Sequence, residues 1–234
     1  MRKVFWDDPY QCSLPTTVAS VVGNEVLFDA TIAFSFSGGQ ESDQATVNGL
    51  YILNSRIHDQ DIIYMLPDNH GLVAGDQVEM KIDWSRRNRL MRLHFACELI
   101  LVLINRLFTN KKSNEELQPE EIDNVGIAKT GAHIAENGAR IDFRLDENIT
   151  KYFEPILAEY NKIIQADLPI EKGYINEIDQ IRYWRIQNIA KVPCGGTHVN
   201  STAEVGLVKL KRDNAGKGIE RIKITLVDPS VKFK

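Results

Sequence analysis

Hydrophobic and polar positions divide the chain near residue 85 into a β-rich part and a part that mixes helices with strands. In the first part, short runs rich in β-branched and aromatic residues alternate with glycine- and proline-bearing turns, and these runs cover residues 16–22, 25–34, 45–53 and 61–66. Residues 75–83 form a turn and then a strictly alternating run in which Val78, Met80 and Ile82 are expected to face a core. The pattern predicts a small antiparallel β-barrel or sandwich over residues 1–85.

The segment from residue 86 to residue 108 is rich in strong helix formers, and Ser85 precedes it as the expected N-cap. Residues 93–104 are apolar on nearly all sides, so this helix is expected to be buried rather than amphipathic. His94 and Glu98 lie four residues apart and therefore project from one helical face. Burying an imidazole and a carboxylate without partners costs several kcal/mol, so we expect both to meet a metal ion or hydrogen-bonding groups.

The rest of the chain alternates strand and helix patterns. Residues 124–135 and 139–145 are expected to form paired strands around the turn Glu136-Asn137-Gly138. Residues 149–164 follow a helical repeat in which Pro155 marks a kink or the start of a new helix. Further strands are expected at residues 181–189, 204–212 and 219–227. Residues 86–234 are thus predicted to form an α+β domain with helices packed on an antiparallel sheet.

A Cys-x-x-x-His pair, Cys194 and His198, is the clearest chemical motif of the chain. Gly195 and Gly196 stand inside it and would let the backbone turn tightly around an ion. With His94 and Glu98 this pair makes a four-ligand transition-metal site, for which Zn²⁺ is the expected ion. In an alternative set, Cys97 replaces Glu98 as a ligand and Glu98 acts as a general base. A zinc protease is disfavoured, because His94 does not open a His-Glu-x-x-His helix.

Composition narrows the class of protein. The 234 residues, 43% of them hydrophobic, suffice for one large or two small domains. Three scattered cysteines and no apolar N-terminal run predict a cytoplasmic protein with reduced thiols. The longest apolar run, residues 99–104, is too short to span a membrane.

The net charge of −4 argues against a polyanionic partner. However, basic residues gather in two runs, which are either solvated faces or RNA-binding surfaces. They are Arg86, Arg87, Arg89 and Arg92 before His94, and Lys209, Lys211, Arg212, Lys217, Arg221 and Lys223 after His198.

Several segments together resemble the editing domain of alanyl-tRNA synthetase and its free-standing relatives, the alanyl-tRNA editing proteins. The likeness is carried by residues 182–186, 193–199, 202–206 and 217–222. It continues in residues 34–43, which look like that family's glycine-rich motif and contain Ser37-Gly38-Gly39-Gln40, and in Gly75-Asp76 followed by Arg89, Met91 and His94. It spans nearly the whole chain apart from the first dozen residues.

The resemblance implies an aminoacyl-tRNA deacylase that removes serine or glycine from mischarged tRNA(Ala), acting in trans because the chain has no room for an aminoacylation module. It implies metal-assisted ester hydrolysis with one Zn²⁺ per chain, and the basic runs would grip the 3′ acceptor end of the tRNA. Candidate substrate-binding residues are Gln40, Thr130, Gly195, Gly196 and Thr197. A rival hypothesis keeps the fold but makes it a non-catalytic RNA-binding module with a structural or degenerate metal site.

Two departures from the family pattern touch the site. Ser37 stands where the family has a third glycine, and Phe34-Ser35-Phe36 stands where it has an aromatic residue followed by Pro-Glu. Glu98 stands where the family has a second histidine. One carboxylate and one thiolate neutralise a Zn²⁺ ion, whereas three histidines and one thiolate leave one positive charge. A more neutral centre is a weaker Lewis acid, so slower or differently tuned hydrolysis is expected.

Overall fold

The computed structural model describes residues 1–109, 115–122 and 127–227. It is an α+β protein, as the sequence predicted, and it separates into two compact units, Met1–Leu90 and Met91–Lys234. The boundary between them falls inside the long helix α2 (Trp84–Thr109). Among the described residues, no helix has the length and apolar character needed to cross a bilayer.

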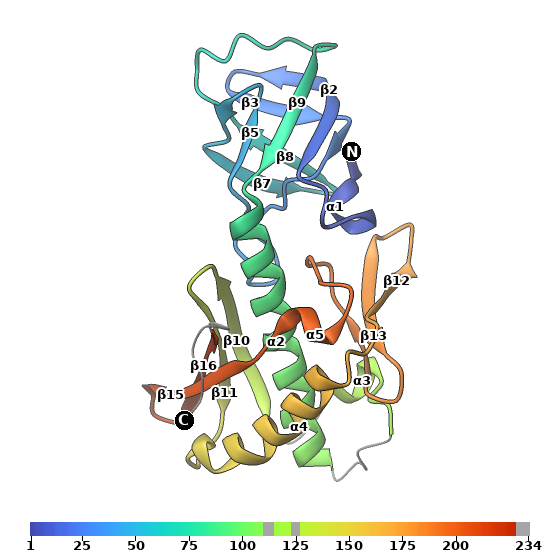
Figure 1. Cartoon of the computed structure of the whole chain (residues 1–234). Coiled ribbons are helices and arrows are strands. Elements are labelled where there is room, and N and C mark those ends of the chain that lie inside the picture. Colours follow the sequence, from blue (N-terminus) through green and yellow to red (C-terminus); the bar gives the residue numbers. More distant parts are fainter. Residues whose placement is uncertain (110–114, 123–126, 228–234) are drawn as a thin grey trace. The chain divides into compact units, whose positions relative to one another are not determined.

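A curled seven-stranded antiparallel sheet makes up most of the N-terminal unit (Figure 1). The strand order is β6-β5-β9-β2-β3-β8-β7. The strands are β2 (Ser13–Val22), β3 (Glu25–Phe28), β5 (Ala45–Val47), β6 (Leu50–Tyr51), β7 (Asn54–His58), β8 (Asp61–Met65) and β9 (Gln77–Ile82). A short parallel pair, β1 (Arg2–Lys3) with β4 (Ala30–Thr31), and the single turn of α1 (Val4–Asp7) complete the unit.

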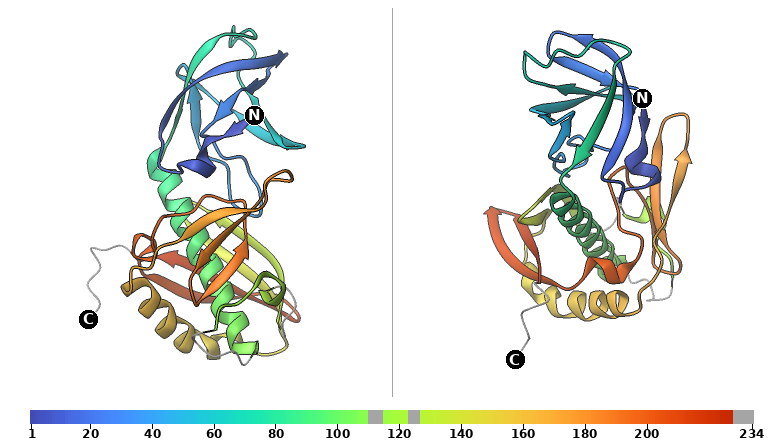
Figure 2. Two further views of the ribbon diagram at one scale, coloured as in Figure 1. Left: turned by 90° about the vertical axis from the view of Figure 1, so that its right-hand side faces the viewer. Right: turned by 45° about the horizontal axis from the view of Figure 1, so that its top comes forward.

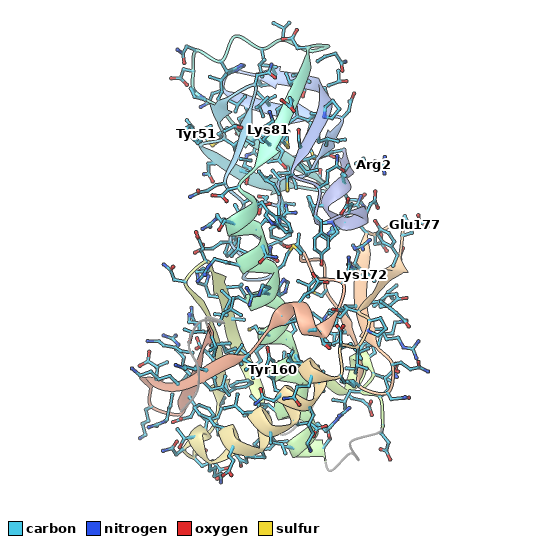
Figure 3. All side chains as sticks on the ribbon, in the orientation of Figure 1. Arg2, Tyr51, Lys81, Tyr160, Lys172 and Glu177 are labelled. Carbon is cyan, nitrogen blue, oxygen red and sulfur yellow. The ribbon has the colours of Figure 1, made fainter. Side chains whose placement is uncertain are left out.

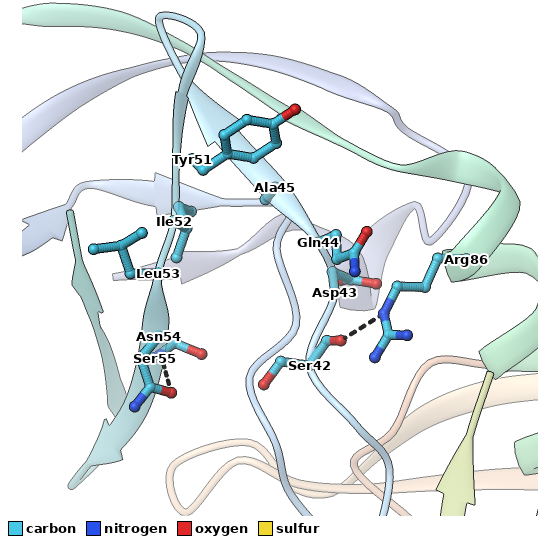
Figure 4. A pocket seen from close by; sticks show the side chains of 10 residues that line it. All are labelled: Ser42, Asp43, Gln44, Ala45, Tyr51, Ile52, Leu53, Asn54, Ser55 and Arg86. Carbon is cyan, nitrogen blue, oxygen red and sulfur yellow. Dashed lines mark hydrogen bonds between the residues drawn. The ribbon is translucent and has the colours of Figure 1, made fainter. Parts of the chain in front are cut away.

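The two end strands of this sheet, β6 and β7, follow one another in the chain with only Ile52 and Leu53 between them. The chain therefore links the two edges of the curled sheet directly, which supports the barrel predicted from the sequence, although no strand pairing of β6 with β7 closes the sheet within the described residues. A cavity of about 490 Å³ lies beside β5, β6 and the start of β7, with Gln44, Tyr51 and Arg86 among the lining side chains (Figure 4). Tyr51 is largely exposed there (Figure 3).

The alternation of buried and exposed residues along the strands determines which side chains form the core of the N-terminal unit. In β9 the residues Val78, Met80 and Ile82 are buried and their neighbours are exposed, as predicted. Two predicted strands are shorter than expected, because the chain changes pairing partner within them. Residues 25–34 divide into β3 and β4 at Asp29, whose backbone bonds Thr17 and Arg2, and residues 45–53 divide into the β5–β6 hairpin at Asn48-Gly49, where both φ angles are positive.

Helix α2 begins one residue before Ser85, so Ser85 is not its N-cap. Asp83 takes that place: its carboxylate accepts the backbone N–H of Arg86 at 3.1 Å. A carboxylate is favoured at this position because it meets unpaired N–H groups at the positive end of the helix dipole. Along residues 93–104 every side chain except that of Glu98 is buried, which confirms the prediction of a core helix.

The C-terminal unit holds two antiparallel sheets with α2 between them (Figures 1 and 2). The first has the order β10-β11-β16-β15, from β10 (Ala128–Ala135), β11 (Gly138–Arg144), β16 (Ile219–Leu226) and β15 (Val208–Gly216). The second is β12 (Glu171–Asn176), β13 (Ile181–Ile186) and β14 (Ala190–Pro193). The helices are α3 (Pro119–Ile122), the 3-10 turn η1 (Ile149–Tyr152), α4 (Phe153–Gln165) and α5 (Thr202–Val205).

The hairpin around residues 136–138 is confirmed, although residues 124–126 of its first predicted strand lie outside the described residues. Pro155 lies in the first turn of α4, so it marks the start of a new helix rather than a kink. Residues 204–205 are helical rather than extended, because Ser201 and Glu204 form a capping box that starts α5. The predicted strand 181–189 ends at Ile186, where a turn closed by the Ile189 N–H bond to Ile186 leads into β14.

Candidate metal centre

Four side chains from two distant segments of the C-terminal unit converge on one point. His94 and Glu98 come from α2, while Cys194 and His198 come from the loop after β14. Their possible ligand atoms all lie within 4.8 Å of one another. Cys194 Sγ is 3.5 Å and Glu98 Oε1 is 3.6 Å from His94 Nε2, and Glu98 Oε2 is 3.8 Å from His198 Nε2. These are the four residues that the sequence nominated as metal ligands.

Backbone hydrogen bonds hold the loop of Cys194 and His198 at both ends. The Cys194 N–H donates to the Arg182 carbonyl at 2.9 Å, which continues the pairing of β14 with β13. Past His198, the Asn200 carbonyl accepts the N–H of Ile170 at 2.8 Å. Within the loop the Gly196 N–H points to Cys194 Sγ at 3.5 Å. Neither Gly195 nor Gly196 has a positive φ, so the loop does not depend on a left-handed backbone at these glycines.

Trp184 on β13 orients the carboxylate of Glu98. Its indole N–H donates to Glu98 Oε2, and the ring is fully buried against Phe95, with centroids 4.9 Å apart. Burial alone raises the pKa of Glu98, but the adjacent imidazoles of His198 and His94 outweigh burial and leave that pKa well below its usual range. The carboxylate is therefore ionised near neutral pH and fixed in the direction of the two histidines.

The donor set fits a divalent transition metal. His198 is buried, and its Nε2 atom has no hydrogen-bond partner among the described residues. Burial lowers the pKa of His198 to about 4, so its imidazole is neutral and can offer a lone pair. Burial, and then the charge of Glu98, raise the pKa of Cys194, and a cation at this point would favour the thiolate instead. Two imidazoles, a thiolate and a carboxylate are all normal zinc ligands.

Cys97 does not belong to this group. It is buried on α2, and burial raises its pKa further above that of an ordinary thiol. The four-residue cluster found among the described residues contains Glu98 instead. The arrangement therefore favours Glu98 over Cys97 as the fourth ligand, and this choice stays a prediction.

Replacing Trp184 by phenylalanine is expected to weaken zinc binding by about 10- to 100-fold, because loss of a hydrogen bond that orients a ligand has that typical cost. Phenylalanine keeps an aromatic ring in the pocket and removes only the donor and part of the ring. Zinc affinity is measured by competition with a chromophoric chelator, with Trp6→Phe in the N-terminal unit as the matched control. An unchanged affinity in Trp184→Phe would show that Glu98 needs no such support.

The candidate substrate-binding residues differ in exposure. Gly195 and Thr130 are exposed, and Gly196 is half-buried next to the sulfur of Cys194. Thr197 is buried at 1% exposure, which supports a role within its own turn at least as well as a role toward a substrate. Gln40 is fully buried in the N-terminal unit, and its backbone exchanges two hydrogen bonds with Ser37 across the Gly38-Gly39 turn.

Some arginines of both basic runs form ion pairs or hydrogen bonds within the protein. Arg87 is completely buried against Asp43, and Arg92 donates to the Val205 carbonyl at 3.0 Å. Arg212 pairs with Glu220 at 2.5 Å. These three arginines are therefore engaged in contacts within the fold.

Sequence analysis did not identify two groups that shape the site. Trp184 was present only as part of the family-like segment 182–186, and its bond to Glu98 depends on the sheet lying against α2. Lys172 on β12 (Figure 3) lies 3.5 Å from the His198 carbonyl and also donates to the Asn200 side chain. No local pattern in the sequence connects Trp184 or Lys172 with the four clustered residues.

Comparison with known proteins shows which family the chain belongs to. Residues 181–223 match the family described as the threonyl and alanyl tRNA synthetase second additional domain. The alanyl-tRNA editing protein AlaX-M of Pyrococcus horikoshii is 30% identical over 227 residues, covering 96% of this chain and 97% of that protein. The protein of the same name from Methanosarcina barkeri is 30% identical over 263 residues, covering 96% and 98%. The chain belongs to the family of alanyl-tRNA editing proteins.

The likeness extends to a synthetase. The alanine–tRNA ligase of Methanococcus aeolicus is 25% identical over 243 residues, which cover 95% of this chain and 25% of the ligase. Both units of this chain therefore have a counterpart in one quarter of that larger enzyme.

Proposed function

We propose that this chain is a trans-acting aminoacyl-tRNA deacylase that hydrolyses the ester of tRNA(Ala) mischarged with serine or glycine. The observation that carries the proposal is the convergence of His94, Glu98, Cys194 and His198 in a member of the alanyl-tRNA editing family. The names of the relatives support the substrate class, and the donor set supports Zn²⁺ as the metal.

The residues around the cluster have distinct proposed tasks. A zinc ion held by the four side chains would act as a Lewis acid toward an ester carbonyl or a water molecule. Trp184 keeps the Glu98 carboxylate oriented. Gly195, Gly196, Thr197 and Thr130 are proposed to contact the aminoacyl group and the terminal adenosine, and Gln40 is proposed on the family resemblance alone. A site that hydrogen-bonds the serine hydroxyl would disfavour alanine, because its own polar groups would be left unpaired.

The proposal is tested by incubating the purified protein with Ser-tRNA(Ala), Gly-tRNA(Ala) and correctly charged Ala-tRNA(Ala). Release of serine or glycine should be accelerated over the uncatalysed rate, and release of alanine should not. Absence of acceleration with all three substrates would eliminate the hydrolase.

One observation favours the second candidate, a non-catalytic RNA-binding module with a structural metal site. Structural zinc sites are closed by four protein ligands, whereas catalytic sites commonly keep one position open for water or substrate, and four protein side chains are available in this cluster.

Metal content by emission spectroscopy, measured on the purified protein and on Glu98→Ala, separates the two candidates when combined with the deacylation assay. For the enzyme we expect zinc in the unaltered protein together with hydrolysis, and less zinc in the variant. Zinc without hydrolysis would identify the module, and little zinc in either sample would identify its degenerate form.

A further inference from the structure

The first sheet of the C-terminal unit carries a row of basic side chains on one face. His133 on β10 lies opposite Arg140 on β11, Arg140 lies opposite Lys223 on β16, and Lys223 lies opposite Lys211 on β15. Directly opposed residues of antiparallel strands point to the same face. The four residues, called the basic row below, therefore cross the whole sheet in register, although they come from two hairpins that are far apart in the sequence (Figure 1).

The basic row lies on the outer face of the sheet. The alternate residues Ile141, Ile222 and Ile224 are fully buried, so they define the inner face. In the basic row, Lys211 and Lys223 are exposed, and His133 and Arg140 are half-buried. Because the isoleucine face of the sheet is buried, the opposite face, which carries the four basic side chains, points to solvent.

Positive charge dominates this outer face although the chain as a whole has a net charge of −4. The neighbouring rows add Lys209, Arg144 and Arg221 and two carboxylates, Asp142 and Asp213. Without His133, six cations thus share the face with two carboxylates. The charge is therefore concentrated and not spread over the molecule.

The two carboxylates hold several of these cations in position. Asp142 accepts from Arg221 at 2.6 Å and also bonds Arg140, and Asp213 accepts from Lys223 at 2.6 Å. Like charges directly opposite one another destabilise a sheet, and Asp142 and Asp213 offset this repulsion only in part, since the face holds more cations than carboxylates. An anion bound along the row would remove this repulsion.

We propose that this outer face binds the phosphate backbone of an RNA duplex. The inference rests on the proposed function, for which it names the surface that holds the helical part of the tRNA. Adjacent strands lie about 4.8 Å apart, so the row spans roughly 14 Å from β10 to β15, and long flexible side chains can follow several phosphates over that width. Contacts of this kind read the shape and charge of a duplex and not its sequence.

The test is binding of uncharged tRNA(Ala) by the full-length protein at several salt concentrations. Substituting Arg140, Lys211 and Lys223 together by glutamine should weaken binding roughly 10- to 100-fold at 0.1 M salt. It should also reduce the slope of log K against log salt by about 3, one for each lost phosphate contact. The matched control replaces Lys81, Lys151 and Lys162 by glutamine, which removes the same charge from other exposed positions, and its slope should stay near that of the unaltered protein.

A second variant guards against misfolding of the first. Thr225→Lys adds a cation at an exposed outer-face position opposite Lys209, and it should bind tRNA more tightly with a steeper salt slope. Equal slopes in the triple variant and its control, or no gain from Thr225→Lys in a folded protein, would overturn the proposal. Binding to vesicles of anionic lipid in preference to tRNA would also overturn it.

The uncharged tRNA separates this inference from the proposed function, because it carries no ester. A protein that binds tRNA through the row but deacylates nothing keeps the surface and refutes the hydrolase. A protein that deacylates Ser-tRNA(Ala) and is insensitive to the row substitutions keeps the hydrolase and refutes the surface. No tRNA binding by the unaltered protein refutes both.

Discussion

Cys194→Ala is expected to lower zinc affinity by at least about 100-fold and to reduce deacylation of Ser-tRNA(Ala) by a similar or larger factor. The sulfur lies 3.5 Å from His94 Nε2 and is the only thiol in the cluster. Altering groups that merely orient a ligand already costs 10- to 100-fold in affinity, and removing a ligand leaves three donors and one negative charge fewer. Zinc affinity and the deacylation rate are measured on the same preparation.

Cys97→Ala is the matched control for this experiment. Cys97 is a buried cysteine next to Glu98 on α2, but it lies outside the four-residue cluster. It should keep its zinc and lose only a small amount of stability from the lost packing. The opposite pattern, with zinc lost in Cys97→Ala and retained in Cys194→Ala, would return Cys97 to the ligand set and refute the one described above.

Asp43→Asn is expected to destabilise the N-terminal unit by about 3–5 kcal/mol. Asp43 and Arg87 form an ion pair in which both side chains have 0% exposure. The guanidinium also donates to the Pro9 carbonyl at 2.9 Å, while the Asp43 carboxylate accepts the Phe34 N–H at 2.7 Å. Removing one charge from a buried pair leaves the other without compensation, and this is the costly case. Denaturant unfolding of the full-length chain, followed by circular dichroism, measures the loss.

Two comparisons sharpen this second prediction. Glu25→Gln removes a carboxylate from a partly exposed pair with Arg56, and it should cost far less stability than Asp43→Asn because solvent screens such pairs. The double variant Asp43→Leu with Arg87→Met removes both charges and should recover much of the stability lost in Asp43→Asn. If Asp43→Asn is no more harmful than Glu25→Gln, the buried pair contributes little to the barrel.

Local patterns in the sequence were sufficient for the parts of the site that lie within one element. The i, i+4 spacing of His94 and Glu98 follows from helical geometry, and the apolar surroundings showed that the helix had to be buried. The Cys-x-x-x-His pair is likewise a short-range motif. Strict alternation similarly predicted the inward residues of β9, because a strand has a period of two.

The sequence by itself therefore determined the α+β class, the buried helix that carries His94 and Glu98, and the identity of the four clustered side chains. Only the tertiary structure decided what depends on pairing between distant segments: the bond from Trp184 to Glu98, the burial of Arg87 against Asp43, and the alignment of Arg140, Lys223 and Lys211 across three strands. The physical reason is the sequence separation over which each effect acts. Propensity and periodicity act over a few residues, whereas strand register and contacts between distant segments, such as the bond from Trp184 to Glu98, are set by the packing of the whole unit.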